Sequence, residues 1–319
     1  MNTTPISPPD LPTSDDAQPQ IDATARIPAS GDRALVLGGG GSTGNAWLIG
    51  VVAGLFDAGL DVTTADLTIG TSAGATAAAQ LAGATPPELL AGTLAATPPQ
   101  RGPVGGVPTR PVPDHLEKFR SIIAASDDVA DMRRRMGAAA LDTDAASDGS
   151  GQARWRATVA SRLPSEDWPR RTVLITAVDA HTGEPVVFDR HSGVDLVDAV
   201  AASTSGGGSA YRIHGTGYVD GGYRANAENA DLAAGFERVL VLSPFGGRSL
   251  YPADWGTHLA TQVDALRARG SRVEIISPDS GSEHMFGAGA MDLSLRPAAA
   301  RAGYHQGRAL AEGLTEFWR

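Results

Sequence analysis

Gly70-Thr71-Ser72-Ala73-Gly74 is the stretch that says most about the fold of this chain, and it matches the pattern G-x-S-x-G. Residues 66–69 before it, with Leu67 and Ile69, suit a short buried strand, and the small residues 72–81 suit a helix. A serine between a strand and a helix in this pattern is typical of a nucleophile elbow, in which a sharp turn exposes the hydroxyl. Taken alone, the same serine could simply cap the helix.

A second glycine-rich segment, Leu37-Gly38-Gly39-Gly40-Gly41-Ser42-Thr43-Gly44, lies upstream of this motif. It joins an expected buried strand at residues 33–37 to an expected buried helix at residues 45–58. Glycines let backbone N–H groups turn toward an anion, either a phosphate or the oxyanion of an acyl-transfer intermediate. The loop lacks the Gly-Lys-Ser/Thr ending of a P-loop. A dinucleotide fingerprint, Gly39-x-Gly41-x-x-Gly44, and a purely structural turn both stay open at this point.

The third motif is Tyr218-Val219-Asp220-Gly221-Gly222. It places an aspartate at the end of an expected strand, and the two glycines form the turn that follows. A carboxylate held there could accept a proton from a serine. Asp-Gly is also common in ordinary turns, so the motif gains its meaning only together with the other two.

Strand-like and helix-like segments alternate along residues 32–319, which predicts one α/β domain. The expected fold is a three-layer sandwich in which helices cover a mostly parallel central sheet. Strands are expected at residues 33–37, 66–69, 172–178, 185–188, 217–219, 238–242 and 272–276, and helices at residues 45–58, 72–81, 87–95, 194–202, 255–269 and 297–317.

Two segments are expected to lie outside this layered core. Residues 1–31 are rich in Pro, Thr, Ser and Asp, which predicts a disordered N-terminal tail. Residues 100–163 begin in a Pro/Gly loop and continue as more polar helices, which predicts a helical cap or insertion.

The composition excludes several classes of function. The sequence has no cysteine, which excludes disulfides, cysteine–zinc sites and a thiol nucleophile. The net charge of −10 argues against nucleic acid as a partner. No metal site and no cofactor are expected. No signal segment or membrane-spanning apolar run is visible, so we expect a cytoplasmic protein; transient membrane contact and the oligomeric state stay open.

In their order and spacing, the three motifs resemble the patatin-like phospholipase family, and the similarity extends over residues 33–310. The resemblance implies a patatin-like fold and a serine acyl hydrolase of the lipase, esterase or phospholipase A type, acting on an acyl ester or lipid. It implies a Ser–Asp dyad without histidine, with Ser72 as nucleophile and Asp220 as general base. It further implies an oxyanion hole formed by backbone amides and a set of supporting glycines. The oxyanion-hole residues are Gly39, Gly40 and Gly41, and the supporting residues are Gly44, Gly70, Gly74, Gly221 and Gly222.

The sequence departs from the family pattern in two places. Thr43 stands where the glycine loop of the family usually has Arg or Lys, which removes a cation that would attract an anionic headgroup. The small, polar residues 203–210 stand where a Pro- and Phe-containing segment usually precedes D-G-G. We therefore expect short or medium acyl esters to be better substrates than long-chain phospholipids.

Two alternatives stay open. An α/β-hydrolase with a Ser–Asp–His triad would need a histidine late in the chain, and His284 and His305 are the candidates. A non-catalytic lipid- or metabolite-binding module could also keep the same fold.

Overall fold

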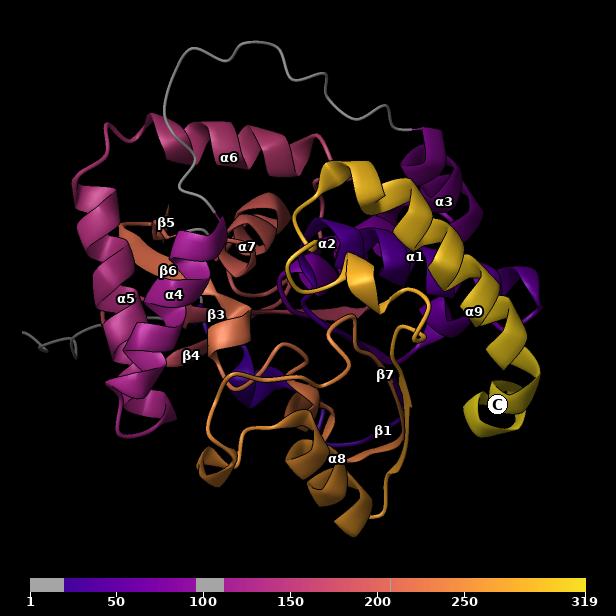
Figure 1. Ribbon diagram of the computed structural model, residues 1–319. Helices are drawn as coiled ribbons and strands as arrows, with labels where there is room; N and C mark the ends of the chain where they lie inside the picture. Colours follow the sequence, from indigo (N-terminus) through magenta and orange to yellow (C-terminus); the bar gives the residue numbers. More distant parts are fainter. Residues whose placement is uncertain (1–19, 96–111, 207) are drawn as a thin grey trace, which may run out of the picture.

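A computed structural model describes residues 20–95, 112–206 and 208–319, and these form a mixed sheet covered by helices on both faces (Figure 1). The strand order is β5-β6-β3-β2-β1-β7-β8, and β4 pairs with β3. The strands are β1 (Gly31–Leu37), β2 (Leu67–Gly70), β3 (Thr172–Asp179), β4 (Pro185–Phe188), β5 (Tyr211–Ile213), β6 (Thr216–Asp220), β7 (Phe236–Leu242) and β8 (Arg272–Ile276). The central strands β3, β2, β1, β7 and β8 are parallel, whereas β4, β5 and β6 form antiparallel pairs. The expected three-layer, mostly parallel α/β fold is confirmed.

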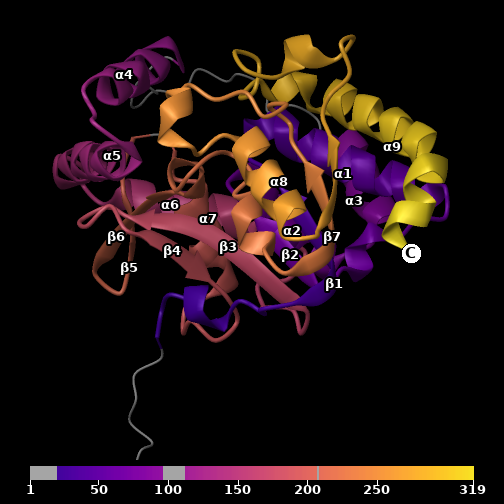
Figure 2. The same ribbon diagram turned by 90° about the horizontal axis from the view of Figure 1, so that it is seen from below.

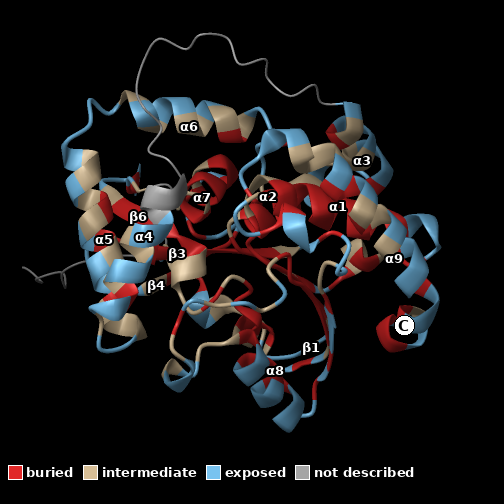
Figure 3. Cartoon of the chain, viewed as in Figure 1, coloured by how far each residue is buried: buried red, intermediate tan, exposed pale blue. Residues whose placement is uncertain are grey.

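Helices cover the two faces of the sheet unequally. The larger group of helices, which includes α1 and α9, lies on one side of β1 and β7. Helix α8 lies on the other side (Figures 1 and 2). The helices are α1 (Gly41–Asp57), α2 (Ala73–Gly83), α3 (Pro86–Ala95), α4 (Val112–Ala124), α5 (Val129–Ala145), α6 (Ser150–Ala160), α7 (Leu196–Ser203), α8 (Leu259–Ala268) and α9 (Arg296–Trp318). Figure 3 shows that α1, α2 and α7 are largely buried, as the apolar sequence of residues 45–58 predicts. None of the helices described is both long enough and apolar enough to cross a membrane.

The strand register determines which loops meet. Gly70 at the end of β2 pairs with Ile175 of β3. Two residues further along β3, Ala177 pairs with Asp220 at the end of the antiparallel strand β6. Asp220 therefore lies level with the position two residues beyond Gly70, which is Ser72. The sheet thus brings the second and third motifs together although 148 residues separate them.

Close packing of α1 against α9 aligns the beginnings of these two helices. A Cβ atom at Gly50 of α1 would lie 2.1 Å from the carbonyl oxygen of Ala300, and one at Gly303 of α9 would lie 2.4 Å from that of Trp47. Only glycine permits this approach of two backbones. The contacts advance along both helices in the same direction, so α1 and α9 run parallel and their N-terminal turns are neighbours.

The prediction of a disordered tail is wrong for residues 20–31. Ala23 is fully buried and donates its N–H to the carbonyl oxygen of Val187 at 2.7 Å. Arg26 forms an ion pair with Asp189 at 2.9 Å. A backbone hydrogen bond and one ion pair thus hold this segment on the folded domain. Its composition did not predict this, because the segment has few apolar residues. Residues 1–19, the rest of the expected tail, lie outside the described residues.

The region expected as a helical cap contains α4, α5 and α6, and its residues 100–111 lie outside the described residues. Phe119 of α4 contacts the rings of Tyr223 and Tyr251, with centroid distances of 5.4 and 5.9 Å. Tyr223 follows shortly after Asp220, so α4 rests close to the third motif. That this region caps the site remains a prediction.

Two smaller expectations about strands differ from the structure. β5 was not expected, because three residues are too few to produce a recognisable pattern. The apolar pattern of residues 272–276 is typical of a buried strand, but β8 is an edge strand in which Arg272, Glu274 and Ile275 are exposed.

Candidate active site

Ser72 occupies the sharp turn between β2 and α2. Its backbone angles are φ 53° and ψ −115°, in a region that non-glycine residues rarely adopt, and such strain is concentrated at functional sites. Gly74 allows the turn, because a Cβ atom there would lie 1.8 Å from the carbonyl oxygen of Leu37 at the end of β1. Gly70 is equally confined, since its Cβ would lie 2.7 Å from Ala75. The geometry is that of a nucleophile elbow.

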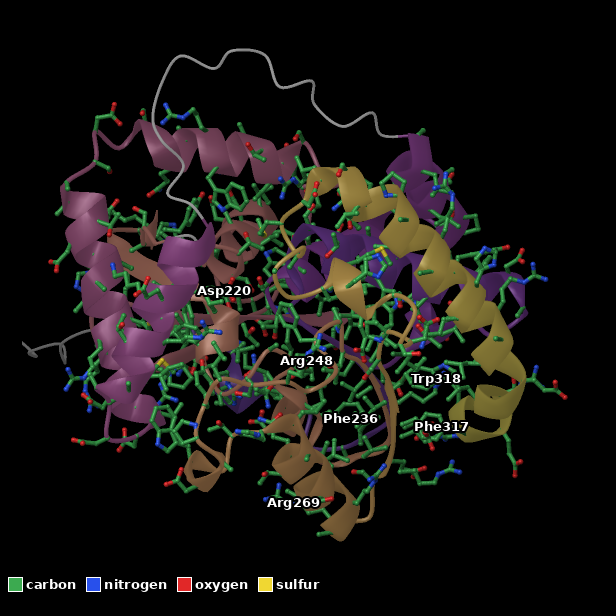
Figure 4. All side chains as sticks on the ribbon, in the orientation of Figure 1. Asp220, Phe236, Arg248, Arg269, Phe317 and Trp318 are labelled. Atoms are coloured by element: carbon green, nitrogen blue, oxygen red, sulfur yellow. The ribbon has the colours of Figure 1, made fainter. Side chains whose placement is uncertain are left out.

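Asp220 lies directly beside the serine. The Oγ of Ser72 donates a hydrogen bond of 2.8 Å to Oδ2 of Asp220, and the N–H of Gly222 donates one of 2.8 Å to Oδ1. Asp220 is only 9% exposed and lies near the middle of the molecule, far from Phe317 and Trp318 at the end of α9 (Figure 4). Burial raises the pKa of Asp220 to about 6, although both hydrogen bonds act to lower it.

A buried network of hydrogen bonds holds the elbow and the aspartate turn together. Thr71 and Thr176 share a hydroxyl–hydroxyl hydrogen bond of 2.9 Å. The Nδ2 of Asn229 donates to Oγ1 of Thr71 and to the carbonyl oxygen of Gly221, both at 3.0 Å. Asn229 is fully buried, with φ 56° in the left-handed region that asparagine tolerates. One side chain thus joins the residue before Ser72 to the residue after Asp220.

Ser203 also supports the elbow from the end of α7. It is fully buried, and its Oγ accepts a hydrogen bond of 3.0 Å from the backbone N–H of Ser72. Ser203 is the first of the small, polar residues 203–210, and Gly207 among them lies outside the described residues. Ser203 itself belongs to α7 and has a defined structural contact.

The glycine loop lies against the elbow. A Cβ atom at Gly39 would lie 3.4 Å from Cβ of Ser72, so these two residues are neighbours. The N–H of Gly39 donates to the carbonyl oxygen of Ala227 at 2.7 Å. Within the described part of the chain, the N–H groups of Gly40 and Gly41 have no acceptor. Gly41 has φ +64°, which favours glycine.

Thr43 of this loop contacts the segment that precedes α9. Its side chain is fully buried, and its Oγ1 donates to the carbonyl oxygen of Met285 at 2.9 Å. Thr43 therefore joins α1 to the segment before α9.

Two tyrosines bind backbone carbonyl groups of the segments next to Asp220. The hydroxyl of Tyr223 donates to the carbonyl oxygen of Gly206 at 3.3 Å, and that of Tyr251 donates to the carbonyl oxygen of Gly222 at 3.3 Å. Burial raises the pKa of both tyrosines, so both are neutral donors at physiological pH. Gly206 itself lies against the carboxylate, since a Cβ there would be 3.0 Å from Oδ2 of Asp220.

The two candidate histidines form no hydrogen bond with Ser72 or Asp220 in the described part of the chain. His284 and His305 are exposed, and the ring of His305 contacts Tyr304 on α9. Among the residues that the structure describes, Asp220 is the hydrogen-bond partner of the Ser72 hydroxyl. Over residues 20–95, 112–206 and 208–319, no three His, Asp or Glu side chains gather as a metal site requires.

A surface hollow of about 550 Å³ lies elsewhere, between α6, α7 and β5. Its lining includes Arg156, Asp198 and Tyr211, but neither Ser72 nor Asp220. These three side chains bind one another, with Arg156 and Tyr211 both donating to Asp198. The hollow is therefore a surface feature beside an internally satisfied network, and the elbow is the better candidate for chemistry.

Sequence reasoning identified the serine and the aspartate but missed the residues that hold them. Asn229 lies outside the three motifs, and Thr71 is only a variable position in G-x-S-x-G. Thr176 and Ser203 carry no local signal, because ordinary strands and helix ends contain such residues. A buried polar residue must find partners, so an Asn after D-G-G was the one available signal.

A serine at a sharp strand-to-helix turn with a buried aspartate beside it is typical of α/β acyl hydrolases. The model of the patatin-like phospholipase family matches residues 35–233, which is more than half of the chain. The chain therefore belongs to the patatin-like phospholipase family, and the general activity indicated is hydrolysis of lipid acyl esters.

The fold is also similar to solved structures. The crystal structure of VipD from Legionella pneumophila is similar with 13% sequence identity and a TM-score of 0.40, covering 90% of this chain and 67% of that chain. None of the curated proteins matches the chain.

Proposed function

We propose that this protein is a serine acyl hydrolase in which Ser72 is the nucleophile and Asp220 the general base. The observation that carries the proposal is the hydrogen bond of 2.8 Å from the Ser72 hydroxyl to the Asp220 carboxylate at a strained elbow. A serine hydroxyl is a weak nucleophile until a positioned base removes its proton. An ordinary aspartate is a poor base at neutral pH, and the raised pKa of Asp220 makes it a stronger one.

The reaction follows from these two groups. The carboxylate of Asp220 takes the proton of Ser72 as Oγ attacks the ester carbonyl carbon. Collapse of the tetrahedral intermediate breaks the bond to the alcohol, which leaves with the proton held by Asp220. Water then attacks the acyl–serine ester as Asp220 accepts a proton from it. When the second intermediate collapses, the bond from the acyl carbon to Oγ breaks, Asp220 returns the proton to Oγ of Ser72, and the acid is released.

The proposed oxyanion hole consists of the backbone amides of Gly40 and Gly41. All three of Gly39, Gly40 and Gly41 were expected to contribute. The N–H of Gly39 is already bonded to Ala227, so its proposed role is to hold the loop against Ser72. Removing a good oxyanion donor from such a site typically costs about 3–4 kcal/mol of transition-state stabilisation.

Substitutions at the dyad test the proposal. Ser72→Ala should abolish hydrolysis of p-nitrophenyl esters and labelling by a fluorophosphonate probe, while the melting transition stays cooperative. Asp220→Asn should lower kcat about a hundredfold or more, because an amide cannot take the serine proton.

Histidine variants and the probe separate the alternatives. His284→Ala and His305→Ala serve as matched controls, and each should retain near wild-type activity. A loss at either histidine as large as that at Asp220 would support a triad instead. A folded wild-type protein that neither labels nor hydrolyses any ester would support the non-catalytic binding module.

A further inference from the structure

A methionine side chain lies against the glycine loop. A Cβ atom placed on Gly41 would be 3.0 Å from the sulfur of Met291 and 2.7 Å from the carbonyl oxygen of Ala290. Met291 and Ala290 belong to the connection between β8 and α9, far from Gly41 in the sequence. The fold therefore places a thioether beside one of the two residues whose amides form the proposed oxyanion hole.

The backbone that carries Met291 is held at the loop. The N–H of Thr43 donates to the carbonyl oxygen of Ala290 at 3.0 Å. Phe286 in the same connection is buried, and its ring centroid lies 6.1 Å from that of Trp47 in α1. The side chain of Met291 therefore extends from a connection that is packed on α1 and bonded to the residue two positions after Gly41.

Met291 carries the sulfur atom that solvent reaches most easily in the described part of the chain. It is 59% exposed, whereas Met132 and Met285 are 0% and 4% exposed and Met136 is half-buried. The sequence contains no cysteine, whose thiolate would otherwise react with a peroxide first. Among the methionines that the structure describes, Met291 is therefore the preferred site of oxidation.

Oxidation changes the chemistry of this contact. When hydrogen peroxide is the oxidant, its O–O bond breaks, one oxygen atom binds to the thioether sulfur, the sulfur loses two electrons and water leaves. The product, methionine sulfoxide, is polar, and its oxygen accepts hydrogen bonds. The N–H groups of Gly40 and Gly41 have no acceptor within the described residues. They are also the donors that we assign to the oxyanion of the substrate.

We propose that Met291 is a site of reversible oxidation by peroxides, and that its sulfoxide oxygen occupies the oxyanion hole and inhibits hydrolysis. This inference rests on the proposed function. The sulfoxide competes with the ester carbonyl for the same two N–H groups, so kcat/KM falls while the hydrogen bond between Ser72 and Asp220 stays intact. Methionine sulfoxide reductases return the sulfoxide to the thioether, which makes the inhibition reversible.

The test oxidises the purified protein with dilute hydrogen peroxide and follows the sites of oxidation together with the activity. Peptide mass spectrometry should find Met291 oxidised before Met132, Met136 and Met285. As Met291 is oxidised, kcat/KM for p-nitrophenyl butanoate should fall about fivefold or more, because the substrate must displace an internal hydrogen bond of ordinary strength. Two methionine sulfoxide reductases, one for each epimer of the sulfoxide, should together restore the activity.

Three variants serve as matched controls, each compared with its own untreated activity. Leucine has about the volume of methionine but no sulfur, so Met291→Leu should lose no activity to peroxide. Met136→Leu should be inhibited as the wild type is. Met291→Gln carries an amide oxygen near the place of the sulfoxide oxygen, and its kcat/KM should be lower than that of Met291→Leu without any oxidant.

Three results would overturn the proposal. They are a Met291 that stays reduced until the buried methionines react, an oxidised Met291 with unchanged kcat/KM, and a Met291→Leu variant that peroxide inhibits as strongly as the wild type.

Amide hydrogen exchange over residues 38–44 gives a readout that needs no catalysis. The sulfoxide should slow the exchange of the Gly40 and Gly41 amides relative to the reduced protein, and an unchanged rate would overturn the proposed contact. A wild type that hydrolyses no ester would instead refute the proposed function, and the exchange rates would still decide whether the sulfoxide binds the loop.

Discussion

Asp220→Asn should stabilise the fold while it removes activity. Asp220 is buried, so its ionised form is less favourable in the folded chain than in the unfolded chain. Asparagine retains the shape and removes the charge. Its Oδ1 can accept from the N–H of Gly222, as the aspartate does, and its Nδ2 can donate to the hydroxyl of Ser72.

The magnitude follows from the pKa of Asp220. Raising this pKa from 3.8 to about 6 corresponds to about 3 kcal/mol of destabilisation at pH 8, where the carboxylate is ionised in both states. The folded pKa lies above the unfolded one, so the penalty is complete above about pH 6 and disappears as pH falls below 3.8. About half of this destabilisation should remain at pH 5.

Thermal and urea unfolding of the wild type and Asp220→Asn between about pH 5 and pH 8 measures this difference. The variant should melt about 5 °C or more above the wild type at pH 8, with a smaller advantage at pH 5. Ser72→Ala is the matched control, because removing the hydroxyl donor raises the pKa of Asp220 further and should lower stability at pH 8. An asparagine variant that is less stable than the wild type at pH 8, or an advantage independent of pH, would refute the reasoning.

Three further predictions concern catalysis, the N-terminal segment and the elbow. The kcat/KM for a neutral ester should rise with pH through about 6 and then level off, because Asp220 must be ionised to take the serine proton; a pH–rate profile that is flat across this range would contradict it. Removing residues 1–30 should lower the melting temperature by several degrees relative to removing residues 1–19, because the longer deletion also removes buried Ala23 and the Arg26–Asp189 ion pair; equal melting temperatures would show that this contact contributes nothing. Gly74→Ala should destabilise the fold by about 3 kcal/mol, since its Cβ would overlap Leu37, whereas Gly92→Ala on the open face of α3 should stabilise it by about 0.5–1 kcal/mol; denaturant titration measures both, and similar values for the two variants would argue against the tight elbow.

The sequence by itself determined the local structure and the chemical groups of the site. The G-x-S-x-G motif between an apolar strand and a small-residue helix identified the elbow at Ser72, and D-G-G identified the turn at Asp220. These signals are local: glycine is needed wherever two backbones approach closely or φ is positive, and apolar periodicity follows from burial. The family and the layered α/β fold follow from the same motifs.

Only the tertiary structure decided how distant residues meet. The register of β2, β3 and β6 places Asp220 level with Ser72, and the folded core then raises the pKa of Asp220. The parallel contact of α1 and α9 brings Arg296 to the glycine loop, where its guanidinium donates to the carbonyl oxygen of Ser42 at 2.7 Å. Neither relation has a local signal, because strand pairing and helix packing depend on contacts between residues more than a hundred positions apart, and a pKa depends on everything that excludes water from the group.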